Sequence, residues 1–565
     1  MVEMAGTRAV CRSLELEGVK HVFGLPGGVV IPLCDEMLNA DFRFILARHE
    51  QGAAHMADGY ARATGGVGVC LATSGPGATN LVTGIGTANI DSSAVVALTG
   101  QVTRATIGTD AFQEVDIIGC SASVTKYNMQ VRKASEIPKA VKSAFRIAST
   151  GRRGAVLLDL PKDVTTDVED VVFPENVTLR GYHPNYTPDP KEIEWAATLL
   201  AKAQRPVVVA GGGVINAGAT RELVALSEYL MAPTATTLMG KGAFPADHPL
   251  SLGLCGMHGT QAANNLVPEA DVLLIVGARL SDRTTGAVKS FAPNAKVIHL
   301  DIDRSEIDKN VETVTRVVGD AALGLRGLLY GVSKLRAQGD AGAQWSKKVA
   351  EFRCQVQGNG NGNGHKSDYL RAPDVIKTIR RALPRESVVT TEVGQCQMWA
   401  ALHYDAYDPR TFFTSGGLGT MGWGFPAAIG VKAARPDIPV LDIAGDGSFG
   451  MTENSMATSI EEELPVVVVV LNNHMLGMVA QWQRLFFDHR YSAVKLKGNP
   501  DMVKLAEAYG AEGVRVNTLP DLEAAIRRAT KSDVSTVIDV PIDPEENVYP
   551  IVPPGAGLKD ALLEA

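Results

Sequence analysis

The chain has 565 residues, 45% of them hydrophobic and 21% charged, which is ordinary for a soluble globular protein of roughly two to four domains. Its net charge of −8 and the lack of a basic run argue against nucleic acid as a partner. Seven cysteines without CxxC do not indicate a disulfide framework or a zinc site, and no signal segment or membrane-length apolar run is present, so we expect a cytoplasmic protein without a membrane partner.

The first part of the chain predicts an α/β domain over residues 1–168. An incomplete apolar stripe indicates a helix from Val2 to Gly18, and an alanine-rich stretch indicates another from Gln51 to Thr64. Short strands, each followed by a loop, are expected at Val19–Phe23, Phe42–Ala47, Val67–Thr73, Val95–Thr99 and Ala155–Leu160. Repeated strand–loop–helix steps are typical of a mostly parallel sheet.

The middle of the chain repeats this pattern. Residues 169–190 lack periodicity and predict a linker. A second α/β set over 190–335 is indicated by strands at Pro206–Ala210, Val272–Val276 and Lys296–Leu300. The glycine- and asparagine-rich stretch Gln357–His365 predicts a flexible connection to a third set over 366–540.

The third set contains the stretch around which the chain is organised. Strands are expected at Pro439–Ala444 and Val466–Leu471, with a helix from about Thr452 to Glu463 between them. Strand, helix and strand predict a right-handed βαβ unit with neighbouring parallel strands. Asp446 and Asn473 would then follow the carboxyl ends of these strands, where open α/β sheets bind ligands.

The residue types at these two strand ends indicate a metal–diphosphate site. Gly445 and Gly447 let a phosphate approach the backbone around Asp446. Asp446 and Asn473 each supply a hard oxygen, and Mg2+ is usually held by few protein oxygens together with phosphate. Alone, the GDG motif is as compatible with a plain turn as with a binding site, and the NN pair is as compatible with a polar strand end. Only their combination favours the metal site.

The tail, residues 541–565, is rich in proline and glycine. This composition argues against a packed helix or strand and indicates a surface tail.

The same stretch carries a resemblance to a known family. GDG, 24 further residues and NN resemble the cofactor motif of thiamine diphosphate enzymes. GDGSF, LNNHMLGMV and QWQRLFFDHRYS resemble the large, catalytic subunit of acetohydroxyacid synthase (acetolactate synthase), and the likeness extends from about Gly18 to the tail. The resemblance implies three doubly wound parallel-sheet domains: pyrimidine-binding, central flavin-type and diphosphate-binding. The tail would then cover the active site.

The resemblance also changes how several single residues are interpreted. On sequence alone, Glu50 suits a helix N-terminus, Met421 is core filler and Trp482 belongs to a core or interface. In the family, the residue matching Glu50 hydrogen-bonds the aminopyrimidine ring of the coenzyme, and the residue matching Met421 forces the coenzyme into a V shape. The residue matching Trp482 selects 2-ketobutyrate over pyruvate. Gln113 and Lys162 match positions that line the route of the substrate, although alone they are ordinary loop residues.

The remaining coenzyme positions follow from the same resemblance. Mg2+ would be held by Asp446, Asn473 and the backbone carbonyl of Met475. Cys396 stands where the family usually has histidine, which removes one donor to the phosphates. The thiamine diphosphate contacts are expected at Gly27, Pro76, Asn80, Val393, Gly394, Gln395, Cys396, Met421, Gly445, Asp446, Gly447, Ser448, Asn473, Met475, Leu476, Gly477 and Met478.

A flavin site is implied in the central domain, with FAD in a structural role. Gly277–Arg283 reads GARLSDR where the family has GARFDDR, so the first arginine is kept and one acidic residue is lost. Three glycines in a row are alone a weak signal and often form a tight turn. The flavin contacts are expected at Arg152, Gly211, Gly212, Gly213, Met257, His258, Gly259, Gly277, Ala278, Arg279, Asp301, Ile302 and Asp320.

The implied activity is decarboxylation of pyruvate on thiamine diphosphate and transfer of the hydroxyethyl unit to a second 2-ketoacid. A second pyruvate gives 2-acetolactate, and 2-ketobutyrate gives 2-aceto-2-hydroxybutyrate, in branched-chain amino acid biosynthesis. A homodimer or homotetramer, with or without a regulatory small subunit, is expected. The alternatives are an oxidase of the pyruvate oxidase type, sulfoacetaldehyde acetyltransferase and a non-catalytic paralogue, although the last is expected to lack Glu50, Asp446 or Asn473.

Overall fold

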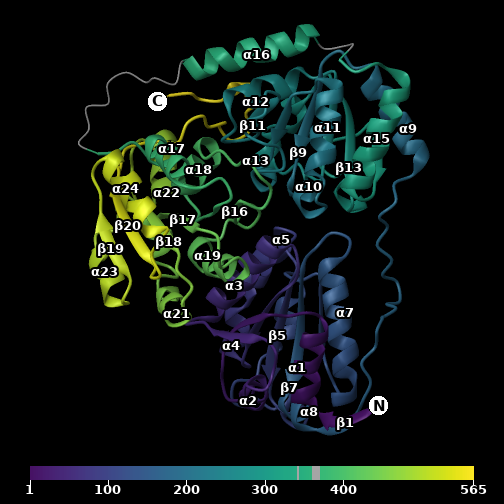
Figure 1. Cartoon of the computed structure of the whole chain (residues 1–565), viewed down its shortest axis with the longest axis vertical. Coiled ribbons are helices and arrows are strands. Elements are labelled where there is room, and N and C mark those ends of the chain that lie inside the picture. The colour runs from purple at the N-terminus through teal and green to yellow at the C-terminus, as the bar shows by residue number, and fades with distance from the viewer. Residues whose placement is uncertain (340–342, 359–368, 565) are drawn as a thin grey trace. The chain divides into compact units, whose positions relative to one another are not determined.

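A computed structural model describes residues 1–339, 343–358 and 369–564 (Figure 1). Most of the predicted connection at Gln357–His365 lies outside these ranges. The chain divides into two compact units, one of residues 1–183, 387–396 and 413–541, the other of residues 184–386, 397–412 and 542–565. Three six-stranded sheets, two in the first unit and one in the second, confirm the predicted α/β fold.

The first sheet has the strand order β3-β2-β4-β5-β7-β6, and all of its pairings are parallel. Its strands are β2 (His21–Leu25), β3 (Arg43–Leu46), β4 (Gly68–Ala72), β5 (Val95–Gln101), β6 (Tyr127–Gln130) and β7 (Ala155–Pro161). Its helices are α1 (Gly6–Leu16), α2 (Ile31–Met37), α3 (Glu50–Thr64), α4 (Pro76–Asn80), α5 (Val82–Ile90), α6 (Ile117–Ser121), α7 (Ile137–Ser149) and α8 (Lys162–Thr166).

Side chains that alternate along these strands pack against helices on both faces of the sheet. Val96 and Leu98 of β5 pack with α1, α2 and α7, whereas Val95 and Ala97 of the same strand pack with α3 and α5. Both faces are therefore apolar, as expected for a parallel sheet covered by helices on each side.

The other sheet of this unit has the order β16-β15-β17-β18-β20-β19. Its strands are β15 (Val388–Thr391), β16 (Phe412–Thr414), β17 (Val440–Gly445), β18 (Val467–Asn472), β19 (Glu512–Arg515) and β20 (Thr536–Pro541). Its helices are α19 (Gly424–Ala434), α20 (Asp446–Phe449), α21 (Ser455–Glu461), α22 (Gly477–Phe486), α23 (Met502–Ala508) and α24 (Leu519–Ala529), whereas α18 (Gln395–His403) begins in this unit and continues in the second.

Helices α3 and α19 join the two sheets of the first unit, and glycines decide how closely they pack. A Cβ on Gly59 would lie 2.1 Å from the carbonyl oxygen of Ala427, and one on Gly430 would lie 1.9 Å from that of Met56. The helices therefore meet backbone to backbone, which places α3 and the loop before α19 in one rigid body.

The sheet of the second unit has the order β11-β10-β9-β12-β13-β14 and is parallel throughout. Its strands are β9 (Pro206–Ala210), β10 (Thr234–Thr236), β11 (Ser251–Leu254), β12 (Val272–Val276), β13 (Lys296–Asp301) and β14 (Thr315–Val318). Its helices are α9 (Pro190–Ala201), α10 (Gly212–Asn216), α11 (Thr220–Leu230), α12 (Gln261–Leu266), α13 (Asp282–Thr285), α14 (Val288–Phe291) and α15 (Ala321–Leu335); α16 (Ala343–Gly358) and α17 (Ala372–Ala382) also belong to this unit.

The N-terminal segment differs from the prediction. The expected helix Val2–Gly18 is a strand, β1 (Val2–Ala5), followed by α1, and β1 pairs antiparallel with β8 (Val168–Val171). β8 begins inside the expected first domain and extends into the expected linker. The apolar stripe did not indicate this pairing, because the partner of β1 lies more than 160 residues away in the sequence. Contacts between distant segments here override the local pattern.

The tail is partly buried, which differs from the surface tail that its composition alone indicates, and its place over the active site stays a prediction. Val548, Ile551, Val552 and Leu558 are buried, and the last two join an apolar core with Phe291 of α14. The backbone forms almost no regular structure there, as its prolines and glycines predict, but its apolar side chains are still covered.

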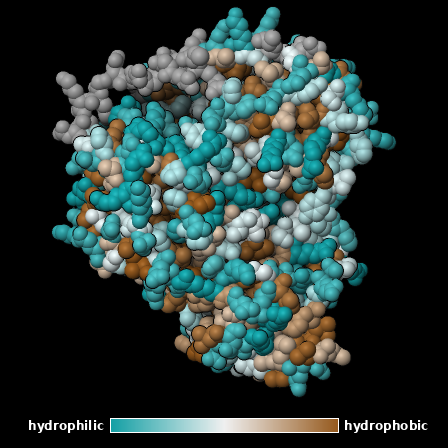
Figure 2. Space-filling model, viewed as in Figure 1, coloured by the Kyte–Doolittle hydropathy of each residue, from teal (hydrophilic) through white to brown (hydrophobic). Residues whose placement is uncertain are grey.

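The surface is mostly hydrophilic, as the overall composition of the chain leads us to expect. Figure 2 shows hydrophilic residues interspersed with smaller hydrophobic patches on the visible face. Among the residues that the structure describes, no helix is both long and apolar enough to cross a membrane.

Candidate functional site

The ends of β17 and β18 bring Asp446 and Asn473 together. The strands are parallel neighbours with Gly445 opposite Leu471, which confirms the predicted βαβ arrangement. Asp446 opens α20, and its carboxylate accepts a hydrogen bond from the backbone N–H of Asn473. Asn499 Nδ2 donates to the same carboxylate at 2.7 Å.

The environment of Asp446 suits a cation. Burial raises the pKa of this carboxyl to about 6, while His474 and backbone donors act in the opposite direction. A bound divalent cation would favour the ionised form and offset the desolvation. Asn473 Oδ1 accepts the Met475 N–H at 3.1 Å and has a second lone pair available for a metal.

The chemistry of this oxygen set fits Mg2+ rather than a transition metal. Within the described parts of the chain, no cluster of three or more His, Cys, Asp or Glu could hold a metal ion. A carboxylate, an amide oxygen and a backbone carbonyl leave open positions for phosphate oxygens, which is how Mg2+ is commonly bound.

The predicted diphosphate loop is tied to the same place through Gln395. Its Oε1 accepts from Asn473 Nδ2 at 3.2 Å, and its Nε2 donates to Gln481 at 2.9 Å. A Cβ on Gly477 would lie 2.1 Å from Gln395 Oε1, so a larger residue there would displace the Gln395 side chain from this position. Cys396 is buried, and its Sγ would lie 3.5 Å from a Cβ on Gly445.

Met421 lies in a loop where glycines take left-handed conformations. Gly419 has φ of +71° and Gly422 has φ of +81°. The Met421 side chain is only half-buried, which does not agree with core filler and leaves it available to a ligand.

Glu50 lies at the carboxyl edge of the first sheet, at the first residue of α3. Its carboxylate is buried and accepts a hydrogen bond from Asn80 Nδ2 at 3.0 Å. Gly27 and Pro76 come from the loops after β2 and β4 at the same edge, and a Cβ on Gly27 would lie 2.5 Å from Thr73. Burial and a specific partner go beyond what an exposed helix-capping charge requires.

Gln113 and Lys162 are also in this part of the unit. Gln113 has φ of +61°, and its carbonyl oxygen lies 2.7 Å from where a Cβ on Gly75 would stand. Lys162 follows β7 directly and opens α8. Both are partly exposed, and their contact with a substrate stays a prediction.

Trp482 lines an apolar cavity of about 730 Å³ on α22. Its ring lies edge-on to Phe486 at 5.7 Å between centroids. The other lining residues are Met478, Val479, Gln483, Phe487, Arg490 and Ser492. The last four belong to the QWQRLFFDHRYS motif, but the sequence analysis did not single them out.

The flavin candidates of the second unit gather at the carboxyl edge of its sheet. Three of them, Gly211, Gly277 and Asp320, follow strands of this sheet, and Asp301 is the last residue of β13. Asp320 also caps α15, because its carboxylate accepts the Leu323 N–H at 3.0 Å. A Cβ on Gly211 would lie 2.2 Å from the Gly277 carbonyl oxygen, so close loop packing alone already requires glycine there.

The other flavin candidates divide between the units. His258 is buried, its Nδ1 lies 3.0 Å from the Pro550 carbonyl oxygen, and burial lowers its pKa to about 4. In the altered segment, Leu280 takes a φ of +53°. Arg152 belongs to the first unit, where its Nε donates to Ser92 at 3.0 Å.

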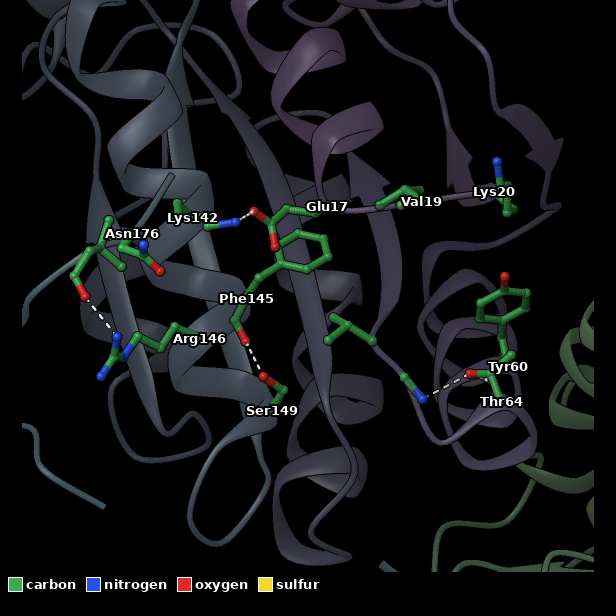
Figure 3. Close-up of a pocket in the computed structure, with 14 residues that line it drawn as sticks. Glu17, Val19, Lys20, Tyr60, Thr64, Lys142, Phe145, Arg146, Ser149 and Asn176 are labelled. Carbon is green, nitrogen blue, oxygen red and sulfur yellow. Dashed lines mark hydrogen bonds and ion pairs between the residues drawn. The ribbon is translucent and has the colours of Figure 1, made fainter. Parts of the chain in front are cut away.

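A second cavity, of about 480 Å³, contains none of the predicted site residues. It lies at the amino edge of the first sheet, where α1, α3 and α7 end (Figure 3). Lys142 pairs with Glu17 at 2.8 Å, and Arg146 donates to the Val177 carbonyl oxygen, so these charged side chains already have partners within the protein.

Sequence reasoning missed the buried support behind the site. Glu392 accepts hydrogen bonds from Gly422, Phe425 and Ser448, and Asn499 contacts Asp446. Glu392 directly precedes the predicted loop at Val393, which was the available signal. Nothing in the local sequence around Asn499 indicates its contact.

Comparison with known proteins matches three family descriptions. Residues 4–120 match "Thiamine pyrophosphate enzyme, N-terminal TPP binding domain", residues 193–328 match the central domain, and residues 392–540 match the C-terminal TPP binding domain. The order of the matches follows the order of the three sheets along the chain.

Curated relatives are similar over nearly their whole length. The chain is 47% identical to a probable acetolactate synthase large subunit of Methanocaldococcus jannaschii, over 98% of this chain and 94% of the relative. It is 44% identical to the acetolactate synthase large subunit of Corynebacterium glutamicum, over 99% and 90%. It is also 44% identical to the isozyme 2 large subunit of Escherichia coli, over 99% of each chain.

Proposed function

The chain belongs to the thiamine pyrophosphate enzymes and, among them, to the acetolactate synthase large subunits, and on this premise we propose that it joins two 2-ketoacids with loss of CO2. Two pyruvate molecules give 2-acetolactate and CO2, and pyruvate with 2-ketobutyrate gives 2-aceto-2-hydroxybutyrate and CO2. The observation that carries this proposal is the buried pair of Asp446 and Asn473 at neighbouring strand ends.

The coenzyme would be anchored through its phosphates. Asp446, Asn473 and the Met475 carbonyl would hold Mg2+, and the loops at 393–396 and 445–448 would face the diphosphate. When bound, thiamine diphosphate supplies a carbon nucleophile that accepts electrons from the departing carboxylate. The three sheets would form pyrimidine-binding, central and diphosphate-binding domains over residues 1–168, 190–335 and 366–540.

Glu50 would act on the aminopyrimidine ring. A buried carboxyl group held by Asn80 can bond a ring nitrogen and exchange a proton with it. Met421 would press the coenzyme into a bent conformation; it is half-buried, and the N–H groups of its neighbours Thr420 and Gly422 are held by hydrogen bonds.

Selection of the second substrate would depend on Trp482. An aromatic wall beside an added methylene typically contributes roughly 1–3 kcal/mol of discrimination. Gln113 and Lys162 would line the route by which substrate arrives. FAD would bind the carboxyl edge of the second unit's sheet in a structural role, because the net reaction involves no redox change.

The assembly is proposed from the relatives. They are named large subunits, so we propose that this chain also pairs with a smaller subunit, on a homodimer or homotetramer of the large chain. The relatives in Methanocaldococcus jannaschii, Corynebacterium glutamicum and Escherichia coli are named acetolactate synthases, which favours this activity over the oxidase and the sulfoacetaldehyde acetyltransferase.

A product assay tests the activity. The purified protein is incubated with pyruvate alone and with added 2-ketobutyrate, with and without thiamine diphosphate, Mg2+ and FAD. We expect both acetohydroxyacids in the complete mixture. Peroxide formation with oxygen uptake, in place of acetolactate, would select the oxidase alternative.

A further inference from the structure

Glu392 is a buried carboxylate that the proposed chemistry does not use directly. It directly follows β15, and its side chain has no exposed surface. Within the described residues, no arginine or lysine pairs with it, and backbone and hydroxyl donors surround it instead. Burial raises the pKa of Glu392, while these donors act in the opposite direction by stabilising the ionised form.

Its donors come from the loops around the proposed coenzyme site. The N–H of Gly422, directly after Met421, donates to Oε2 at 2.8 Å, and that of Phe425 donates to Oε1 at 3.0 Å. Ser448 of the GDGS turn donates to Oε2 at 2.5 Å. One carboxylate therefore joins the loop that carries Met421 to the loop that carries Asp446.

The bonds at Ser448 and Gly422 extend this connection. Ser448 Oγ also accepts the N–H of Val393 at 3.4 Å, so the predicted diphosphate loop is included. The Gly422 carbonyl oxygen accepts from Thr452 at 2.9 Å, so the N–H and the carbonyl group of the residue after Met421 are both held by hydrogen bonds. A Cβ on Gly422 would lie 3.0 Å from Thr452, so the loop has little room to move.

We propose that Glu392 is a positioning residue that sets Met421 relative to the diphosphate-binding turn. The carboxylate lies behind the loops and aligns them through their backbones. The inference rests on the proposed function, because it assigns Glu392 to the geometry of the coenzyme site. Catalytic rates are sensitive to displacements of about 1 Å, so loss of the hydrogen bonds to Glu392 should slow the reaction of the coenzyme.

Asp442 provides a matched control on the neighbouring strand β17. It is equally buried, but its Oδ1 accepts a hydrogen bond from Thr390 at 2.8 Å, and its Oδ2 has no partner among the described residues. Burial, followed by the charge of the neighbouring Glu392, raises the pKa of Asp442 well above the usual range, which favours its neutral form. Asp442→Asn should therefore preserve both charge and loop geometry.

The experiment compares Glu392→Gln, Ser448→Ala and Asp442→Asn with the wild type. Glutamine keeps the size but turns an NH2 group toward at least one donor, which breaks part of the anchor. For each variant, thiamine diphosphate with Mg2+ is titrated by fluorescence, and exchange of the coenzyme C2 proton in D2O is followed by acid quench and NMR. Neither readout needs a 2-ketoacid.

At saturating coenzyme, we expect Glu392→Gln to slow C2-proton exchange by roughly 10- to 100-fold, Ser448→Ala to slow it less, and Asp442→Asn to match the wild type. Far-UV circular dichroism should be unchanged. If Glu392→Gln lowers only the melting temperature while exchange is normal, the residue is merely structural and the proposal is overturned.

Two further outcomes decide the remaining cases. If Glu392→Gln does not fold, Ser448→Ala carries the test, and a normal exchange rate in that variant overturns the proposal. If the wild type itself neither binds the coenzyme nor exchanges its proton, the proposed function fails, which is distinguishable from failure of the Glu392 assignment.

Discussion

Glu50 is the residue whose chemistry the proposed reaction needs most directly. Its carboxylate is buried at the start of α3 and held by Asn80 at 3.0 Å. We predict that Glu50→Gln lowers kcat by about 10²- to 10⁴-fold, the range typical of a lost general acid–base group, while the fold is kept. Steady-state kinetics and far-UV circular dichroism measure the two effects.

The control for this variant is Glu17→Gln. Glu17 is also partly buried, but it pairs with Lys142 at the opposite edge of the same sheet. It should retain wild-type kcat. Normal turnover in Glu50→Gln would contradict the role of Glu50.

His258 gives a prediction about pH. Its folded-state pKa of about 4 lies below the ordinary value of 6.5, chiefly because of burial, so the folded state keeps it neutral. The stability it contributes is present above pH 6.5 and is lost as the pH falls toward 4, because the unfolded state takes up the proton first. His258→Gln removes this dependence while keeping a donor for Pro550.

The measurement is the free energy of unfolding of wild type and His258→Gln at pH 7.5 and pH 5. Between these values, the variant should gain about 2 kcal/mol relative to the wild type, since each unit between the pH and 6.5 corresponds to 1.36 kcal/mol. Equal pH dependence of the two proteins would show that His258 becomes protonated within the fold.

At the scale of elements, the packing of α3 against α19 determines how the two sheets of the first unit are joined. A Cβ on Gly430 would lie 1.9 Å from the Met56 carbonyl oxygen, which belongs to the backbone and cannot move aside independently. We predict that Gly430→Ala destabilises the protein by roughly 1–3 kcal/mol or more, by overpacking. Its lowered melting temperature is compared with that of Gly498→Ala, because a Cβ on Gly498 meets nothing within 4 Å. Equal melting temperatures would contradict the close helix contact.

Elements whose bounds are marked by neighbouring residues in the sequence could be predicted, whereas elements that depend on distant partners could not. β9 and β12 match their predicted bounds, since continuous apolar runs end at glycine or at polar residues. β1 and β8 could not be predicted, because each is stabilised by a partner distant in sequence.

The site divides in the same way. Asp446 and Asn473 were predictable, because strand ends at one sheet edge must converge. Glu392 and Asn499 reach the site through side-chain contacts that depend on tertiary packing, and no periodicity encodes them. The role of Glu50 came from a family resemblance, because sequence alone favoured a helix-capping charge.

For the whole molecule, coenzyme binding should appear as added stability. A ligand that binds only the folded state at 100 times its Kd adds about 2.7 kcal/mol. We predict that thiamine diphosphate with Mg2+ raises the melting temperature and that a chelator reverses the shift.

Asp446→Asn separates this effect from flavin binding. It removes the carboxylate proposed for Mg2+ and should abolish the shift caused by thiamine diphosphate, while any shift caused by FAD remains. Differential scanning fluorimetry with each ligand alone measures both. A full thiamine diphosphate shift in Asp446→Asn would contradict the assignment of this residue.

The most direct test of the central claim is acetolactate formation from pyruvate by the wild-type protein before and after removal of thiamine diphosphate and Mg2+. The account predicts that activity disappears on removal, returns when both are restored, and does not return in Asp446→Asn. Undiminished acetolactate formation after complete removal, or full recovery in Asp446→Asn, would contradict it.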